Sequence, residues 1–72
     1  MLEYEAIHTG PKTVEFHMRT LQGRRIFQIY LDLPTPRFRV FLENSNEQIP
    51  AMVWTTELDA LILQAEEICG IR

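Results

Sequence analysis

Hydrophobic and polar residues alternate along most of the first two thirds of the chain, with the two-residue period of a half-buried β-strand. In residues 12–21, every second side chain from Val14 to Met18 is apolar. Residues 24–33 and 37–43 repeat this alternation. The three predicted strands therefore share one apolar face, made of Val14, Phe16, Met18, Phe27, Ile29, Leu31, Leu33, Phe38, Val40 and Leu42.

Glycine and proline mark the boundaries of these strands. Residues 8–11, His-Thr-Gly-Pro, predict a turn, because glycine supplies a positive φ and proline presets the bend. This turn separates a first short strand, residues 2–7, from the next one. Residues 22–23, Gln-Gly, predict a tight hairpin turn. The two prolines in residues 33–36 favour an extended connection that pairs poorly.

The last third of the chain predicts a helix. Thr55 or Thr56 is the expected N-cap, and Glu57 and Asp59 would lie in the first turn, where the helix dipole favours negative charge. Gly70 suits the left-handed position just past the helix end. The apolar stripe at helical spacing consists of Leu58, Leu61, Ile62, Ala65 and Cys69.

Together these elements predict an α+β fold. Residues 51–54 follow Pro50 and are expected to form a short edge strand, which gives an antiparallel β-meander of four or five strands. The apolar stripe of the C-terminal helix would cover the apolar face of this sheet in two layers. The 72 residues leave room for a single small α+β domain, 1–72, whose core stability is marginal.

Composition and charge narrow the class of protein. The single cysteine cannot form an internal disulfide, and neither a signal peptide nor an apolar run of membrane-spanning length is evident, so we expect a cytoplasmic protein without membrane contact. Residues 1–42 carry six basic and four acidic side chains, whereas residues 43–72 carry one and six. This asymmetry can steer a partner to one side of the molecule.

The sheet face opposite the helix is the expected functional surface, because packing already accounts for the other face. It would expose aromatic rings flanked by arginines, an arrangement that holds single-stranded nucleic acid by base stacking and phosphate contacts. In the alternative interpretation the rings are cross-strand partners, or are buried against a second subunit. The face carries Glu15 and Gln28, and the nucleic-acid-binding residues are predicted to be His17, Arg19, Tyr30, Arg37, Arg39 and Phe41.

A second functional class remains open beside nucleic-acid binding. The protein would then be a protein-binding adaptor or inhibitor, such as a small phage or bacterial regulator, that acts through the same sheet face or through its acidic C-terminal helix. Aromatic rings interleaved with arginine favour nucleic acid, whereas a contiguous apolar patch favours a protein partner. The exposed position of Leu63 on the helix, with a marginal core, also favours a homodimer.

Catalytic, cofactor and metal chemistry find little support in the sequence. The residues His8, His17 and Cys69 lack the spacing of metal ligands, and the three glycines form no phosphate-binding loop. Glu15, His17 and Arg19 share a strand face and could supply a base, an acid and a phosphate anchor. A two-layer domain of this size lacks a pocket that excludes water, so we expect no enzymatic activity, no cofactor and no metal.

The order of elements over residues 24–69, strands followed by one helix that opens at Trp54-Thr55-Thr56-Glu57-Leu58 and continues through Leu61-Ile62, resembles the transcriptional coactivator family that binds single-stranded DNA through a curved sheet and dimerises through its helices. The lysine-rich sheet of that family, and its glycine-lysine approach to the last strand, are absent here, where residues 48–51 read Gln-Ile-Pro-Ala. The resemblance concerns the pattern only and implies a nucleic-acid site on the sheet.

Overall fold

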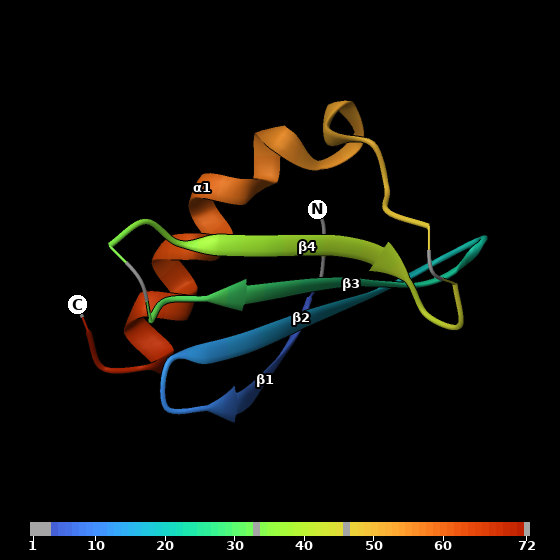
Figure 1. Cartoon of the computed structure of the whole chain (residues 1–72). Helices are drawn as coiled ribbons and strands as arrows, with labels where there is room; N and C mark the ends of the chain where they lie inside the picture. The colour runs from blue at the N-terminus through green and yellow to red at the C-terminus, as the bar shows by residue number, and fades with distance from the viewer. Residues whose placement is uncertain (1–3, 33, 46, 72) are drawn as a thin grey trace.

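The computed structural model describes residues 4–32, 34–45 and 47–71. It contains one antiparallel sheet of four strands in the order β1-β2-β3-β4, followed by one C-terminal helix (Figure 1). The elements are β1 (Glu5–Gly10), β2 (Thr13–Thr20), β3 (Gly23–Tyr30), β4 (Arg37–Leu42) and α1 (Ala51–Ile68). The predicted α+β fold is therefore confirmed. Within the described ranges, no helix has the length and apolar character needed to cross a membrane.

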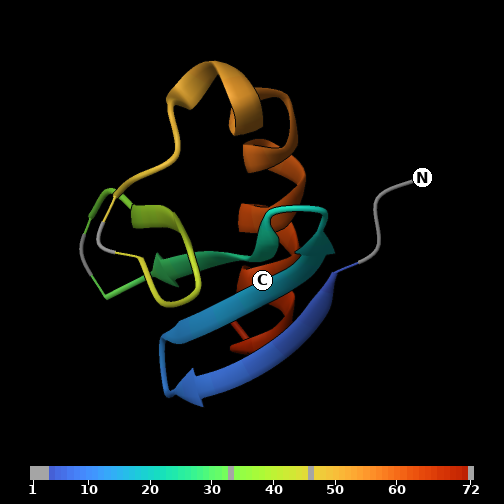
Figure 2. The same ribbon diagram turned by 90° about the vertical axis from the view of Figure 1, so that its right-hand side faces the viewer.

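The core lies between one face of the sheet and α1, which crosses behind the strands (Figure 2). The strand register places Phe16 opposite Phe27, and Phe27 opposite Val40, and all three side chains are almost fully buried. From the helix, Leu61 and Ala65 fill this layer, as the predicted stripe requires. The predicted core face is confirmed for the seven described residues that are buried, whereas Leu42 is half-buried and Phe38, at the β4 edge, is 37% exposed. The seven are Val14, Phe16, Met18, Phe27, Ile29, Leu31 and Val40.

The predicted start of the helix is wrong. Residues 51–54 are the first turn of α1 rather than an edge strand, and Pro50, with an extended ψ of 143°, occupies the N-cap position. The contacts of Trp54 account for the difference. Its Nε1 donates a 2.8 Å hydrogen bond to the carbonyl of Ile49, five residues earlier, and its ring makes long-range edge-on contacts with Phe27 and Phe38. Proline at a strand start and proline just before a helix look alike in sequence.

This earlier start moves the predicted capping residues into the helix. Thr55 lies in the second turn, and its hydroxyl donates to the carbonyl of Ala51. The predicted N-cap at Thr55 or Thr56 is therefore wrong, and the first turn contains no acidic residue. Glu57 lies further along and accepts a hydrogen bond from the hydroxyl of Tyr4, which ties α1 to the residue before β1.

The turn between β1 and β2 also differs from the prediction. Strand β1 continues to Gly10, so the chain reverses at Pro11 and Lys12, and the predicted turn over residues 8–11 is correct only at its end. A register shift between His8 and Gly10 accommodates the extra length. Residues 2–3 of the predicted first strand, and Leu33 of the third, lie outside the described residues. The hairpin between β2 and β3 is confirmed, but its two turn residues are Leu21 and Gln22 rather than Gln22 and Gly23, because Gly23 pairs with Thr20 as the first residue of β3.

The predicted end of the helix is confirmed. Gly70 adopts a φ of 72° just past the C-cap, Cys69. The Ile71 amide donates to the Glu66 carbonyl at 2.9 Å and the Gly70 amide to the Glu67 carbonyl at 3.1 Å, which together form a Schellman motif. Cys69 packs against the core, and burial raises the pKa of its thiol, which is consistent with a small apolar side chain.

Replacement of Leu61 by alanine should destabilise the protein far more than the same change at Leu63. Leu61 is 2% exposed and Leu63 is 43% exposed, so only Leu61→Ala removes buried apolar contacts. We expect a loss of about 2–5 kcal/mol in the free energy of unfolding for Leu61→Ala, against roughly 0.5 kcal/mol or less for Leu63→Ala. Urea unfolding monitored by Trp54 fluorescence measures both. Equal losses would contradict this packing of α1.

Candidate nucleic-acid interface

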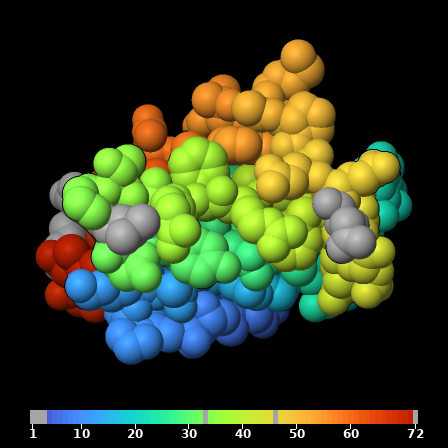
Figure 3. Space-filling view, viewed as in Figure 1, coloured from blue at the N-terminus to red at the C-terminus, as the bar shows by residue number. Residues whose placement is uncertain are grey.

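The candidate interface is the sheet face that points away from α1, which we call the open face. Alternation along β2, β3 and β4 directs to it all the side chains predicted as a binding surface: Glu15, His17, Arg19, Gln28, Tyr30, Arg37, Arg39 and Phe41. The β3–β4 register places Tyr30 opposite Arg37 and Gln28 opposite Arg39. In Figure 3, β4 crosses the middle of the visible surface, with the start of α1 above it and β1 below.

Each aromatic ring on the open face carries an arginine over it. The Cζ atom of Arg39 lies 4.7 Å from the ring centroid of Phe41, two residues further along β4. The Cζ atom of Arg37 lies 5.5 Å from the ring centroid of Tyr30, its cross-strand partner. Both arginines are exposed and both rings are half-buried, so the guanidinium groups form the outer layer. Such contacts hold a guanidinium group over a ring and leave N–H groups that can bond to a ligand.

A hollow adjoins these pairs at the edge of the sheet. It is lined by Tyr30, Arg37, Phe38 and Arg39, so it combines two positive charges with two aromatic rings. Arg37 Nη2 also lies 3.9 Å from Asp32 Oδ1, in an exposed ion pair that contributes little to stability. The hollow therefore presents positive charge and ring surface to the same volume of solvent.

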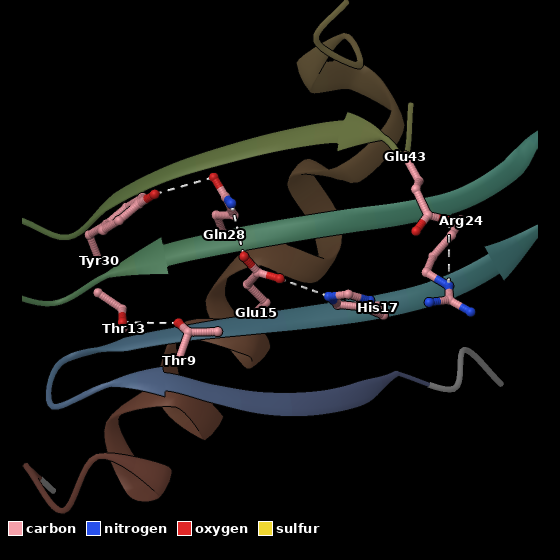
Figure 4. Close-up of polar contacts among 8 residues, drawn as sticks. All are labelled: Thr9, Thr13, Glu15, His17, Arg24, Gln28, Tyr30 and Glu43. Carbon is pink, nitrogen blue, oxygen red and sulfur yellow. Dashed lines mark hydrogen bonds and ion pairs between the residues drawn. The ribbon is translucent and has the colours of Figure 1, made fainter. Parts of the chain in front are cut away.

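A chain of hydrogen bonds crosses the middle of the open face from β2 to β3 (Figure 4). Glu15 Oε1 lies 2.9 Å from His17 Nε2, and Glu15 Oε2 accepts a 2.9 Å hydrogen bond from Gln28 Nε2. Gln28 Oε1 in turn accepts a 3.2 Å hydrogen bond from the hydroxyl of Tyr30. These contacts orient the Tyr30 ring beneath Arg37 and engage both oxygens of the Glu15 carboxylate.

The charge of Glu15 is held by these partners. Partial burial alone would raise the pKa of this carboxyl, but hydrogen bonds from His17 and Gln28, together with the charge of His17 when it is protonated, lower the pKa below its ordinary value. Glu15 therefore remains negatively charged on a face that also carries the positive charges of Arg19, Arg37 and Arg39. It divides the open face into a β4 part, with Arg37 and Arg39, and a β2 part, with Arg19.

Ile26 is the residue whose role the sequence did not reveal. Alternation assigns it to the open face, yet it is only 7% exposed. In the register it lies between His17 on β2 and Phe41 on β4. Ile26 and the two flanking rings form a small apolar cluster on the open face. The sequence could have identified this cluster only if the register of both strand pairs, β2–β3 and β3–β4, had been known.

The structure does not bring all six predicted site residues together. Tyr30, Arg37, Arg39 and Phe41 form two ring–arginine pairs on β3 and β4. Arg19 lies on β2 directly opposite Arg24, at the other end of the sheet, where like charges repel. Comparisons with protein-family models, with curated proteins and with solved structures find no match for this chain. The resemblance to the coactivator family therefore stays a likeness in the order of elements.

The stability contributed by Glu15 should depend on pH. Because its pKa is lower in the folded protein than in the unfolded chain, the ionised carboxylate stabilises the fold above the unfolded-state pKa, and this stabilisation is lost as the pH falls through the folded-state pKa. We expect Glu15→Gln to lower the free energy of unfolding at about pH 7, and the difference from wild type to shrink toward about pH 3.

Urea unfolding of the two proteins at both pH values measures this difference. Glu67→Gln, at an exposed position on α1, is the matched control and should differ little from wild type at either pH. A destabilisation by Glu15→Gln that is equally large at the acidic pH would contradict the hydrogen-bonded carboxylate.

Proposed function

We propose that this protein is a small cytoplasmic, non-enzymatic binding protein that holds single-stranded nucleic acid on its open face. The observation that supports this most directly is the pairing of each half-buried ring on the open face with an exposed arginine, Arg37 over Tyr30 and Arg39 over Phe41. Aromatic rings interleaved with guanidinium groups suit a ligand that has both flat bases and regularly spaced phosphates.

The two arginines lie along one strand, and each is in contact with an aromatic ring. Arg37 and Arg39 are separated by one residue on β4, so they project from the same face about 6.6–6.8 Å apart along the strand. A base can stack on a guanidinium plane as well as on a ring, and each base stacked on a ring contributes about 1–3 kcal/mol. Two such positions support weak binding without sequence preference.

A binding role fits this face better than a catalytic one. Glu15, the candidate base beside His17, has both carboxylate oxygens occupied by hydrogen bonds within the protein. The hollow beside Tyr30 is open to solvent along the sheet edge rather than enclosed. These hydrogen bonds lower the pKa of Glu15 and so make it a weaker general base, and catalysis gains from exclusion of water.

Loss of Arg37 or Arg39 should weaken binding and reduce its dependence on salt. Fluorescence anisotropy of a labelled single-stranded oligonucleotide, titrated with protein at several salt concentrations, measures both quantities. Each phosphate contact on a single strand contributes about −0.7 to the slope of log affinity against log salt, so Arg37→Ala or Arg39→Ala should make the slope less steep by about that amount.

Arg24→Ala is the matched control for these variants. It removes one positive charge from the same face, but Arg24 lies at the far end of β3 from Tyr30, beside Glu43 at 4.0 Å, and belongs to neither ring–arginine pair. We expect its affinity and salt slope to stay close to those of wild type. Equal effects of all three substitutions would indicate attraction by overall charge and not a site on β4. No binding by the wild type at low salt would overturn the proposal.

The rings should contribute through stacking, which is less sensitive to salt. Tyr30→Leu and Phe41→Leu keep apolar bulk on the open face and remove the flat π surface. We expect each to weaken oligonucleotide binding by about 1–3 kcal/mol, roughly 5- to 150-fold, with little change in the salt slope. Circular dichroism checks that the fold is retained. Unchanged affinity in both variants would show that the rings serve only as cross-strand partners.

A protein partner is the second candidate function. The observation in its favour lies at the start of α1, where Met52 is 89% exposed and Val53 beside it is also exposed. Both follow a segment that turns back along β4 and ends at Pro50. If oligonucleotide binding fails, Met52→Ser identifies this site by loss of a partner captured by the wild type, with Leu21→Ser, at an exposed hairpin position, as the control.

A further inference from the structure

The outer edge of β1 offers a row of unpaired backbone groups. β1 is the first strand in the sheet order and forms the lower border of the sheet in Figure 1. Among the described residues, no strand pairs with its outer side. The five residues from Glu5 to Thr9 are all exposed. An open edge of this kind is a template for pairing with another strand, and soluble proteins usually protect it.

The register shows which groups of β1 point outward. The Leu31 amide donates to the Lys12 carbonyl, so alternate residues of β2 from Val14 onward bond to β3, and Glu15 and His17 bond to β1. Their β1 partners are Ile7 and Glu5. The residues between and beyond these, Ala6 and His8, therefore direct their N–H and C=O groups away from the sheet.

We propose that β1 pairs with β1 of a second copy, antiparallel and centred on Ile7. In this register Ala6 of each copy lies opposite His8 of the other, so each outward pair exchanges both backbone hydrogen bonds. Glu5 of each copy then lies opposite Thr9 of the other, so a carboxylate faces a hydroxyl and no like charges meet. A twofold axis relates the two copies, as in most homodimers.

The side chain of Ile7 favours a second copy as the occupant. It is 37% exposed on the open face. In the proposed register it belongs to a pair that is not hydrogen-bonded across the interface, where opposing side chains approach most closely. The two isoleucines would therefore cover each other, and centring the pairing on Ala6 or His8 instead would bring Ile7 opposite Glu5 or Thr9.

This interface differs from the helix-mediated dimer that the exposed Leu63 favoured in the sequence. It joins two four-stranded sheets into a continuous one and leaves β4, the strand with Arg37 and Arg39, at the two outer borders. It therefore does not depend on the proposed nucleic-acid site, and either can fail without the other. Pairing of two short strands buries less surface area than a standard protein–protein interface, so we expect a weak dimer.

Sedimentation velocity over a range from low to high micromolar protein tests this interface. We expect the wild type to shift from monomer to dimer with concentration. Ile7→Lys should remain monomeric, because it places two like charges at the twofold axis. Leu63→Lys is the matched control at a similarly exposed apolar position, and it should dimerise as the wild type does. Ala6→Pro is a second variant that removes an outward N–H without loss of a bond to β2, and it should also be monomeric.

A mixing experiment distinguishes self-pairing at residue 7 from any other contact. Ile7→Lys and Ile7→Glu should each be monomeric alone and should associate when mixed, because opposite charges then face each other across the axis. Circular dichroism confirms that each variant is folded. A wild type that stays monomeric, a dimer that survives Ile7→Lys and Ala6→Pro, a dimer lost in Leu63→Lys, or a mixture that does not associate would each overturn the proposal.

Discussion

The pairing of β2 with β3 is the constraint on which the rest of the structure depends. It places Phe16 directly opposite Phe27, with both side chains removed from solvent. Because side chains alternate between faces, a slip of β2 by one residue against β3 would turn Phe16 outward and bring Glu15 beneath α1. Burial of an unpaired carboxylate is far costlier than its exposure, so this register is strongly preferred.

The same register builds the open face. Once Phe16 and Phe27 point toward α1, Glu15 and Gln28 must be neighbours on the other side, where they hydrogen-bond. Tyr30 follows two residues after Gln28 and completes the hydrogen-bond chain through its hydroxyl. The orientation of the ring beneath Arg37 is therefore a consequence of core packing on the far side of the sheet.

The sequence was most informative where one physical signal acted alone. The alternation of apolar residues in β2, β3 and β4 was enough to assign both faces, and Gly70 was enough to predict the end of α1. It was least informative at residues 51–54, where Pro50 is compatible with either a strand or a helix start. The packing of the Trp54 ring against Phe27 and Phe38 favours the helix, and no local pattern contains these long-range contacts.

The candidate site was predictable in its membership but not in its arrangement. Alternation alone placed Arg37, Arg39 and Phe41 on one face. The stacking of Arg37 on Tyr30 requires the β3–β4 register, and the isolation of Arg19 requires knowledge that it lies opposite Arg24. Both depend on which strands are neighbours, and a two-residue period carries no information about that order.

The two edge strands of the sheet, β1 and β4, differ in how far their outward backbone groups are hydrogen-bonded. The outward edge of β4 is partly occupied, because the Ile49 amide bonds to the Val40 carbonyl as the chain turns toward α1. β1 lacks such a cover among the described residues, so its outward groups at Ala6 and His8 are left to water or to another strand. Association through β1 would satisfy them and keep both open faces on the same side of one sheet. The ring–arginine pairs of the two copies would then lie at the two outer borders of this sheet. One long single-stranded nucleic acid that contacts both sites would gain affinity from the second contact.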